Sequence, residues 1–388
     1  MSTFIDTQRV QLLRSARGLT QTDLANALDV PSSTFARIEN GRLEADESVI
    51  EVIARSLGCS PKVLTTPIFD VLYTRPWLRA YADAPKKTVD QYVADTLLAV
   101  ENIDSLHLRR MPDRLPAFSG DPQDEADVDD FALEVRQAAD VPMESGVPNV
   151  TRAAERLGCV VLPMDHELGK HLGLSTRVDD VPVIRVSRAG ERVPGDRQRF
   201  TMAHELGHIL LHSTCPPPDS SEQAREIEKQ AHRFASAFLL PGDAFLEDLS
   251  TARGNRVTLS SLLALKERWG VAIKAMVVRL QQLGRIDSDQ ARSLYKQISA
   301  RGWNTGEPIF VGNERAVWLT KALDRRFPGG TAYADAARVA GLDVSWFESW
   351  TNWDELSEPS AEVLAFAPRA GRRTRVGTGG SVTRLGQQ

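Results

Sequence analysis

The stretch FTMAHELGHILLH, from Phe200 to His212, constrains this chain more than any other part of the sequence. Its apolar residues would lie on nearly every side of a helix, as expected for a helix that is buried in a core. Helical residues four apart share one face, so His204 and His208 can hold one ion between them, and Glu205 can reach a water on that ion. This HExxH spacing predicts a zinc site. The alternative is a pair of core histidines satisfied by hydrogen bonds.

A second HELG precedes it, in the stretch MDHELGKHLG. Its histidines, His166 and His171, are five residues apart, which places them about 140° apart around a helix. A proline and two glycines nearby make a long helix improbable there. We therefore assign no metal to this stretch.

The third metal ligand has to come from another helix. His212 lies about 12 Å along the helix from His204, too far to share an ion with it. The stretch EIEKQAHRFASAFLLP has the apolar pattern of a second buried helix, and its Glu228 can face the metal. Glu222 and Glu226 remain alternatives.

The first 65 residues have the pattern of short amphipathic helices joined by tight turns. Thr20 is a natural N-cap for a helix from Gln21 to Leu28, and Gly41 suits the left-handed position after a second helix that begins at Ser32 or Ser33. LTQTDLANALDV followed by STFARIENG resembles the Xre/Cro/C1 class of helix-turn-helix domains. In such a domain short polar side chains read base edges and their neighbours contact phosphates. The first role falls to Ser32, Ser33, Thr34 and Arg37, and the second to Gln21, Asn40 and Arg42.

The charge of this segment is a weak point for DNA binding. Residues 1–65 carry seven basic against eight acidic side chains, a net charge of −1. Because phosphate neutralisation dominates DNA affinity, the segment alone should bind duplex DNA weakly. A homodimer would strengthen binding, and the amphipathic helix expected over 87–110 is a candidate seam. The alternative is a helix-turn-helix that makes protein contacts only.

The remaining sequence completes a mainly helical α+β fold. CVVLPM is followed by LSTRVDDVPVIRVS, whose strand-like alternation around an Asp179–Asp180 turn predicts a small antiparallel sheet. The chain shows no membrane span and no secretory signal, and its three scattered cysteines fit a reducing cytoplasm. We expect five regions: a DNA-binding domain (1–65), a helical connector (66–118), a metallopeptidase domain (119–300), a helical C-terminal region (301–367) and a basic disordered tail (368–388).

QRFTMAHELGHILLH followed by E-x-x-A-H-R-F-A…LLP resembles the ImmA/IrrE family of metallopeptidases over about residues 140–290. The resemblance implies that His204, His208 and Glu228 bind zinc and that Glu205 is the catalytic base. Where the family usually has Glu-Ala-Asn, this chain has Gln-Ala-His, ending at His232. That histidine could orient Glu228, join the site or support an oxyanion.

The family resemblance and the fused helix-turn-helix together indicate a function. We expect a cytoplasmic zinc endopeptidase that binds double-stranded DNA and regulates transcription by limited cleavage of a partner repressor or antitoxin. The substrate would lie along an edge strand, with Val181–Val186 as the candidate. LKERWGVAIKAMVVRLQQLG resembles a second helix-turn-helix unit, which we expect to pack or to present substrate. Two alternatives remain: a regulator that uses the peptidase fold as a sensor without cleaving, and one half of a toxin–antitoxin pair.

Overall fold

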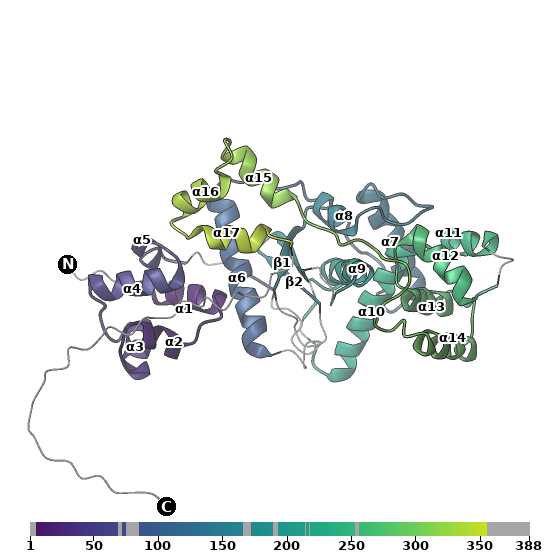
Figure 1. Ribbon diagram of the computed structural model, residues 1–388, viewed down its shortest axis with the longest axis horizontal. Helices are drawn as coiled ribbons and strands as arrows, with labels where there is room; N and C mark the ends of the chain where they lie inside the picture. Colours follow the sequence, from purple (N-terminus) through teal and green to yellow (C-terminus); the bar gives the residue numbers. More distant parts are fainter. Residues whose placement is uncertain are drawn as a thin grey trace, which may run out of the picture. The chain divides into compact units, whose positions relative to one another are not determined.

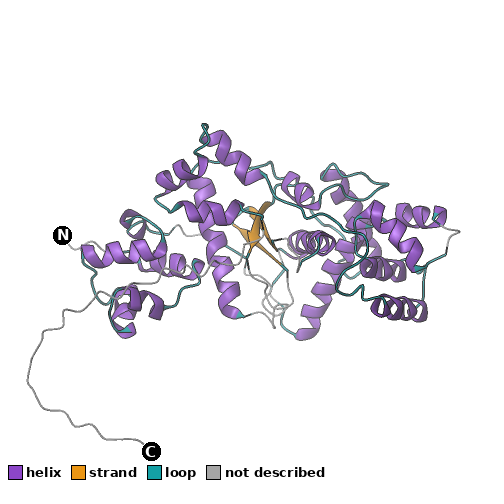
Figure 2. Ribbon diagram, viewed as in Figure 1, coloured by secondary structure: helices purple, strands orange, loops and turns teal. Residues whose placement is uncertain are grey.

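The computed structural model describes residues 5–68, 72–74, 85–165, 172–188, 193–213, 215–216, 218–252 and 256–354. Both the second HELG motif and the basic tail lie outside these residues. None of the described helices combines the length and the apolar character that a membrane span requires. The described part is mainly helical with one small sheet (Figures 1 and 2), so the predicted fold class is confirmed.

Five short helices form the N-terminal domain. They are α1 (Thr7–Ala16), α2 (Gln21–Ala27), α3 (Ser32–Glu39), α4 (Glu47–Leu57) and α5 (Pro61–Leu64). Thr20 caps α2 in a reciprocal capping box with Asp23, as its sequence position predicts. Gly41, which follows α3, has a φ of +68°, in the left-handed region that glycine adopts without strain. These local signals fix where α2 begins and where α3 ends.

A long helix, α6 (Lys86–Ser105), follows and packs against α1. Arg9 of α1 places its guanidinium on Glu101 of α6, with Nη2 to Oε1 at 2.6 Å, and Arg9 is almost fully buried. The apolar side of α6 is covered by α1 and by the sheet. The surface that we expected as a dimer seam is therefore occupied within the chain.

The central region consists of helices around a three-stranded sheet. Its elements are α7 (Glu125–Ala138), α8 (Val150–Arg156), β1 (Val160–Met164), β2 (Gly173–Val178), β3 (Val181–Ser187), α9 (Gly195–His212), α10 (Ser221–Leu239), α11 (Gly242–Thr251), α12 (Leu259–Trp269), α13 (Ile273–Gln282) and α14 (Ser288–Ala300). α9, which carries the HExxH motif, packs against β2, β3 and α10.

The sheet has the strand order β1-β3-β2, and it is mixed. β2 and β3 form the expected antiparallel hairpin around Asp179 and Asp180, where Asp179 has a φ of +49°. β1, however, pairs parallel with β3, so the expectation of a wholly antiparallel sheet is wrong for this strand. The tight turn forces β2 and β3 to be antiparallel, whereas β1 reaches the other edge of β3 through a longer connection.

Three helices end the described chain: α15 (Trp318–Arg326), α16 (Ala332–Ala340) and α17 (Val344–Thr351). α17 packs against β1, and Trp346 on α17 donates its indole N–H to the carbonyl of Gly58 at 2.9 Å. The guanidinium of Arg17 lies 3.8 Å from the centre of the same indole ring. These helices therefore connect the N-terminal domain with the sheet.

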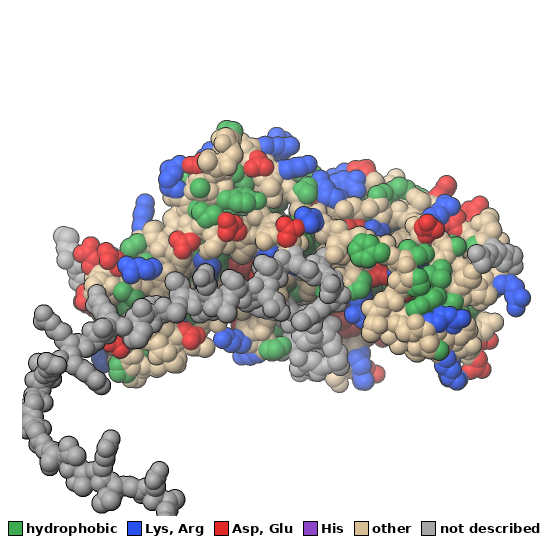
Figure 3. All heavy atoms as spheres, in the orientation of Figure 1, with side chains coloured by type: hydrophobic (Ala, Val, Ile, Leu, Met, Phe, Trp, Pro, Cys, Tyr) green, Lys and Arg blue, Asp and Glu red, His purple; other side chains and the backbone are tan. Residues whose placement is uncertain are grey.

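Two large cores meet at the sheet. Ile184 and Val186 belong to the core formed with α9 and α10, whereas Val183 belongs to the core shared by α6, α17 and the N-terminal helices. Alternating residues of one strand thus serve different cores, as the period of two in a strand requires. On the face seen in Figure 3, basic and acidic side chains are interspersed over the described residues.

Candidate metal centre and active-site cleft

The HExxH helix α9 is held between the sheet and α10. Ala203 and Leu206 are fully buried on this helix. Gly207 lets α10 approach closely, because a Cβ at this position would lie 3.0 Å from the ring of Phe234 and 3.4 Å from Cα of Ala231. This packing brings the side chains of α10 up to the two motif histidines.

Three predicted ligand atoms converge between α9 and α10. The Nε2 atoms of His204 and His208 are 3.1 Å apart, and each lies 3.3 Å from a carboxylate oxygen of Glu228. Ligands about 2.1 Å from a tetrahedral ion are separated by about 3.4 Å, so the spacing and the donor types both fit zinc. Glu222 is exposed and Glu226 lies 3.6 Å from Lys229, so Glu228 is the acid that the fold brings to the histidines.

The environment keeps Glu228 ionised. Burial alone would raise the pKa of its carboxyl group, but in the metal-free protein the protonated imidazoles of His204 and His208 beside it hold that pKa well below its usual range. A carboxylate that stays charged near neutral pH is the form that binds a cation.

A hydrogen-bonded chain runs behind His208 and defines its tautomer. Nδ1 of His208 lies 3.2 Å from Nδ1 of His212, and Nε2 of His212 lies 2.9 Å from Oε1 of Gln230. Because the amide oxygen of Gln230 only accepts, His212 carries its proton on Nε2 and accepts on Nδ1. Burial lowers the pKa of His212 to about 3, so this imidazole stays neutral. His208 must then carry its proton on Nδ1, which leaves the Nε2 lone pair free for a metal.

Glu205 is buried beside this group and faces the sheet. Ser175 of β2 donates its hydroxyl to Oε2 of Glu205 at 2.7 Å. Gly173, at the start of β2, leaves room for the same side chain, because a Cβ there would lie 2.8 Å from Cγ of Glu205. The carboxylate is thus oriented by β2, and it lines the same cleft as His204 and Glu228.

His232 lies at the rim of the site. It is exposed, and its ring centre lies 4.6 Å from that of His204. Its nearest ring nitrogen, His204 and Glu228 form a group whose candidate ligand atoms lie within 4.8 Å of one another. The geometry is compatible with a role as a further ligand, and the other two roles raised from the sequence stay open.

The proposed substrate strand needs correction. β3 contains Val181–Val186 and is the middle strand, paired on both sides, so it has no free edge. β2 is an edge strand, and Arg177 uses its outward groups to pair with Thr74. Because outward groups alternate along a strand, Gly173 and Ser175 point the same way, beside Glu205.

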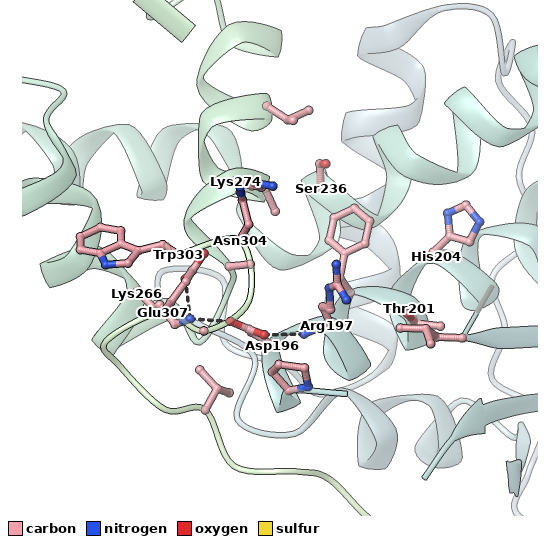
Figure 4. A pocket seen from close by; sticks show the side chains of 18 of the residues that line it. Asp196, Arg197, Thr201, His204, Ser236, Lys266, Lys274, Trp303, Asn304 and Glu307 are labelled. Carbon is pink, nitrogen blue, oxygen red and sulfur yellow. Dashed lines mark hydrogen bonds and ion pairs between the residues drawn. The ribbon is translucent and has the colours of Figure 1, made fainter. Parts of the chain in front are cut away.

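The cleft extends beyond the predicted site into a part of the chain that the sequence did not assign to it. It encloses about 1140 Å³, and besides the metal group it is lined by α13, α14 and residues 303–311. Figure 4 shows His204 and Thr201 at one end, Asp196 and Arg197 between, and Trp303 with Lys274 at the other. The segment that follows α14, WNTGEPIF, contains three large apolar residues outside any periodic pattern, and these were the available signal for a binding surface.

The predicted DNA-contacting residues lie on or next to α2 and α3. Ser32, Ser33, Arg37, Asn40 and Arg42 are exposed, and Thr34 is half-buried. Gln21, which is half-buried, donates its amide to the buried Glu39 at 2.5 Å. The exposed residues of α3 are thus accessible, whereas Gln21 is held by Glu39; the contacts of these residues with DNA stay a prediction.

Comparisons with known families place both parts of the chain. The family model of the M78 peptidases, described as the IrrE N-terminal-like domain, matches residues 154–281, and a model described as a helix-turn-helix domain matches residues 7–65. No curated protein matches the chain in a sequence comparison. The chain therefore joins a helix-turn-helix domain, which indicates DNA binding, to a peptidase domain of the IrrE type. All four predicted metal-site and catalytic residues fall within the matched peptidase segment.

Proposed function

We propose that this protein is a DNA-binding, zinc-dependent endopeptidase that regulates transcription by limited cleavage of a partner repressor or antitoxin. The observation that carries the proposal is the meeting of His204, His208 and Glu228 within 3.1–3.3 Å of one another, with Glu205 beside them. A helix-turn-helix domain on the same chain supports a target at or near DNA.

The residues divide the chemistry among them. His204, His208 and Glu228 would hold zinc, which supplies a water of lowered pKa and polarises a peptide carbonyl. Glu205 accepts the proton of the attacking water and returns it to the leaving amine. Ser175 keeps the Glu205 carboxylate oriented during both transfers.

The substrate is expected to add to β2. A peptide that pairs with the outward groups of Gly173 and Ser175 would lie next to Glu205. This placement replaces the strand chosen from the sequence. We also propose that the chain divides into five regions, with boundaries at residues 65, 118, 300 and 367. We further propose that the protein binds DNA as a homodimer.

The test compares the parent with Glu205→Gln. Both should hold one zinc, because Glu205 is not a ligand, and both should fold alike, because glutamine still accepts from Ser175. We expect the parent to cut the repressor or antitoxin encoded beside its gene, and the variant to cut roughly 10²- to 10⁴-fold more slowly. A partner left intact by zinc-loaded parent protein would favour the non-cleaving regulator instead.

A further inference from the structure

The cleft of the proposed peptidase continues from the metal group to an apolar lobe at its far end. This lobe, which we call the distal lobe, is lined by Ala275 and Val278 of α13, Tyr295 of α14, and Trp303 and Phe310 of the following segment. Tyr295, Trp303 and Phe310 lie outside the segment that matches the IrrE-type domain. Its three aromatic residues are therefore supplied by a part of the chain beyond the matched domain.

Buried ion pairs fix the wall of the distal lobe. Lys266 of α12 is 1% exposed, and its ammonium contacts Glu307 at 2.5 Å and also contacts Asp196 in the first turn of α9. Glu307 in addition accepts the backbone N–H of Ile273 at 3.0 Å. Glu307 is thereby held at the starts of both α9 and α13, and Figure 4 shows its pairing with Lys266 next to Asp196. The segment 303–311 is anchored to the wall of the cleft at this residue.

The distal lobe presents apolar surface to solvent. Phe310 is 81% exposed and Val278 is 40% exposed, and both line the cleft. Binding sites characteristically combine such apolar surface with a few polar groups. A large apolar side chain that enters the lobe would remove this surface from water.

Two unpaired cations accompany the apolar surface. Lys274 and Arg197 line the cleft and are exposed, and none of the ion pairs between described residues includes either side chain. The acids nearest the lobe, Asp196 and Glu307, are already engaged by Lys266. The positive charge is therefore available to an acidic group of a ligand.

We propose that the distal lobe is a specificity subsite that selects peptides carrying a large apolar residue close to an acidic one, on one side of the cleaved bond. The occupant is an extended peptide because the lobe is continuous with the metal group and with the outward edge of β2. This inference rests on the proposed peptidase function.

The experiment uses the zinc-loaded full chain and an equimolar mixture of synthetic decapeptides randomised at every position. Mass spectrometry of the products gives the preference at each position. We expect enrichment of Phe, Leu, Met or Trp at one fixed position and of Asp or Glu near it. In the double variant Val278→Ser, Phe310→Ser the apolar preference should fall about tenfold or more. Val339→Ser, at a 54% exposed valine outside the cleft, is the matched control and should keep it.

The charge preference has its own pair of variants. Lys274→Glu should exchange the preference for Asp or Glu for one for Lys or Arg, whereas Lys296→Glu, at an exposed lysine of α14 outside the cleft, should keep the parental profile. Parental profiles in the double variant and in Lys274→Glu would overturn the subsite while leaving the peptidase proposal intact.

A binding arm separates the subsite from catalysis. The same mixture is captured on zinc-loaded Glu205→Gln protein, with and without the distal-lobe substitutions. Selective capture that the substitutions abolish supports the subsite even if the parent cuts nothing, in which case only the peptidase proposal fails. Capture without any apolar preference, together with unselective cleavage, overturns the subsite.

Discussion

Replacing His212 should weaken zinc binding although His212 is not expected to touch the metal. His212→Ala removes the acceptor for the Nδ1 proton of His208 and the link to Gln230. His208 then loses the group that fixes its tautomer and ring orientation. The effect should therefore appear in metal affinity before it appears in the fold.

The magnitude follows from burial. His212 is 1% exposed, so the Nδ1 proton of His208 would be left with little access to water. An unsatisfied buried donor costs about 1–3 kcal/mol, which corresponds to roughly 5- to 150-fold in a dissociation constant. Loss of a partner behind a metal ligand typically weakens metal binding by about 10- to 100-fold, which agrees.

The assay is competition for zinc against a chromophoric chelator at pH 7.5, with melting of the metal-free protein as the check on folding. Gln230→Glu should tighten zinc binding, because a carboxylate accepts more strongly from His212 and makes His208 more basic. His107→Asn, at an exposed histidine away from α9, is the control. A dissociation constant for His212→Ala within twofold of the parental value would refute the relay.

Four further outcomes are expected. Gly173→Ala should lower kcat by roughly tenfold to a hundredfold at unchanged zinc content, because its Cβ would push against Cγ of Glu205 at 2.8 Å; unaltered turnover would contradict the close packing. Native protein should react with one equivalent of a thiol reagent at pH 8, at the exposed Cys215, because burial raises the pKa of the other two cysteine thiols to about 12. Those two thiols ionise near pH 9 when unfolded, so the folded state keeps more protons and its stability should fall as pH rises from about 9 to 12 in urea titrations. Arg42→Ala should weaken duplex-DNA binding and reduce its log–log salt slope by about one, measured by anisotropy, and an unchanged slope would remove Arg42 from the phosphate contacts.

Local patterns predicted the elements that carry the chemistry. The HExxH spacing, the apolar face of α10 and the capping signals around α2 depend on neighbours within one or two turns, and the structure has these helices as expected. Fixed helical geometry also ruled out His212 as a third ligand. Its contact with Gln230 was not predictable, because it depends on how α9 packs against α10.

Features that depend on tertiary pairing were missed for the same reason. The residue pattern of β3 indicated a strand. It could not indicate the position of that strand in the sheet, because a strand buried on both faces has the same pattern at an edge as in the middle. In the wall of the distal lobe, the buried Lys266 of α12 contacts both Asp196 of α9 and Glu307. Hydrophobic periodicity in the sequence cannot predict a contact between residues so far apart in the chain.

The core shared by the N-terminal helices, α6, α17 and one face of the sheet has a practical consequence for genetics. Deletion of residues 1–65 would expose the apolar side of α6 and the indole of Trp346 to solvent. The truncated protein should therefore aggregate. The two proposed activities are therefore best separated by single substitutions at exposed α3 residues or at Glu205, not by truncation of the chain. Because the core is shared, a different N-terminal domain would require compensating substitutions on α6 and α17.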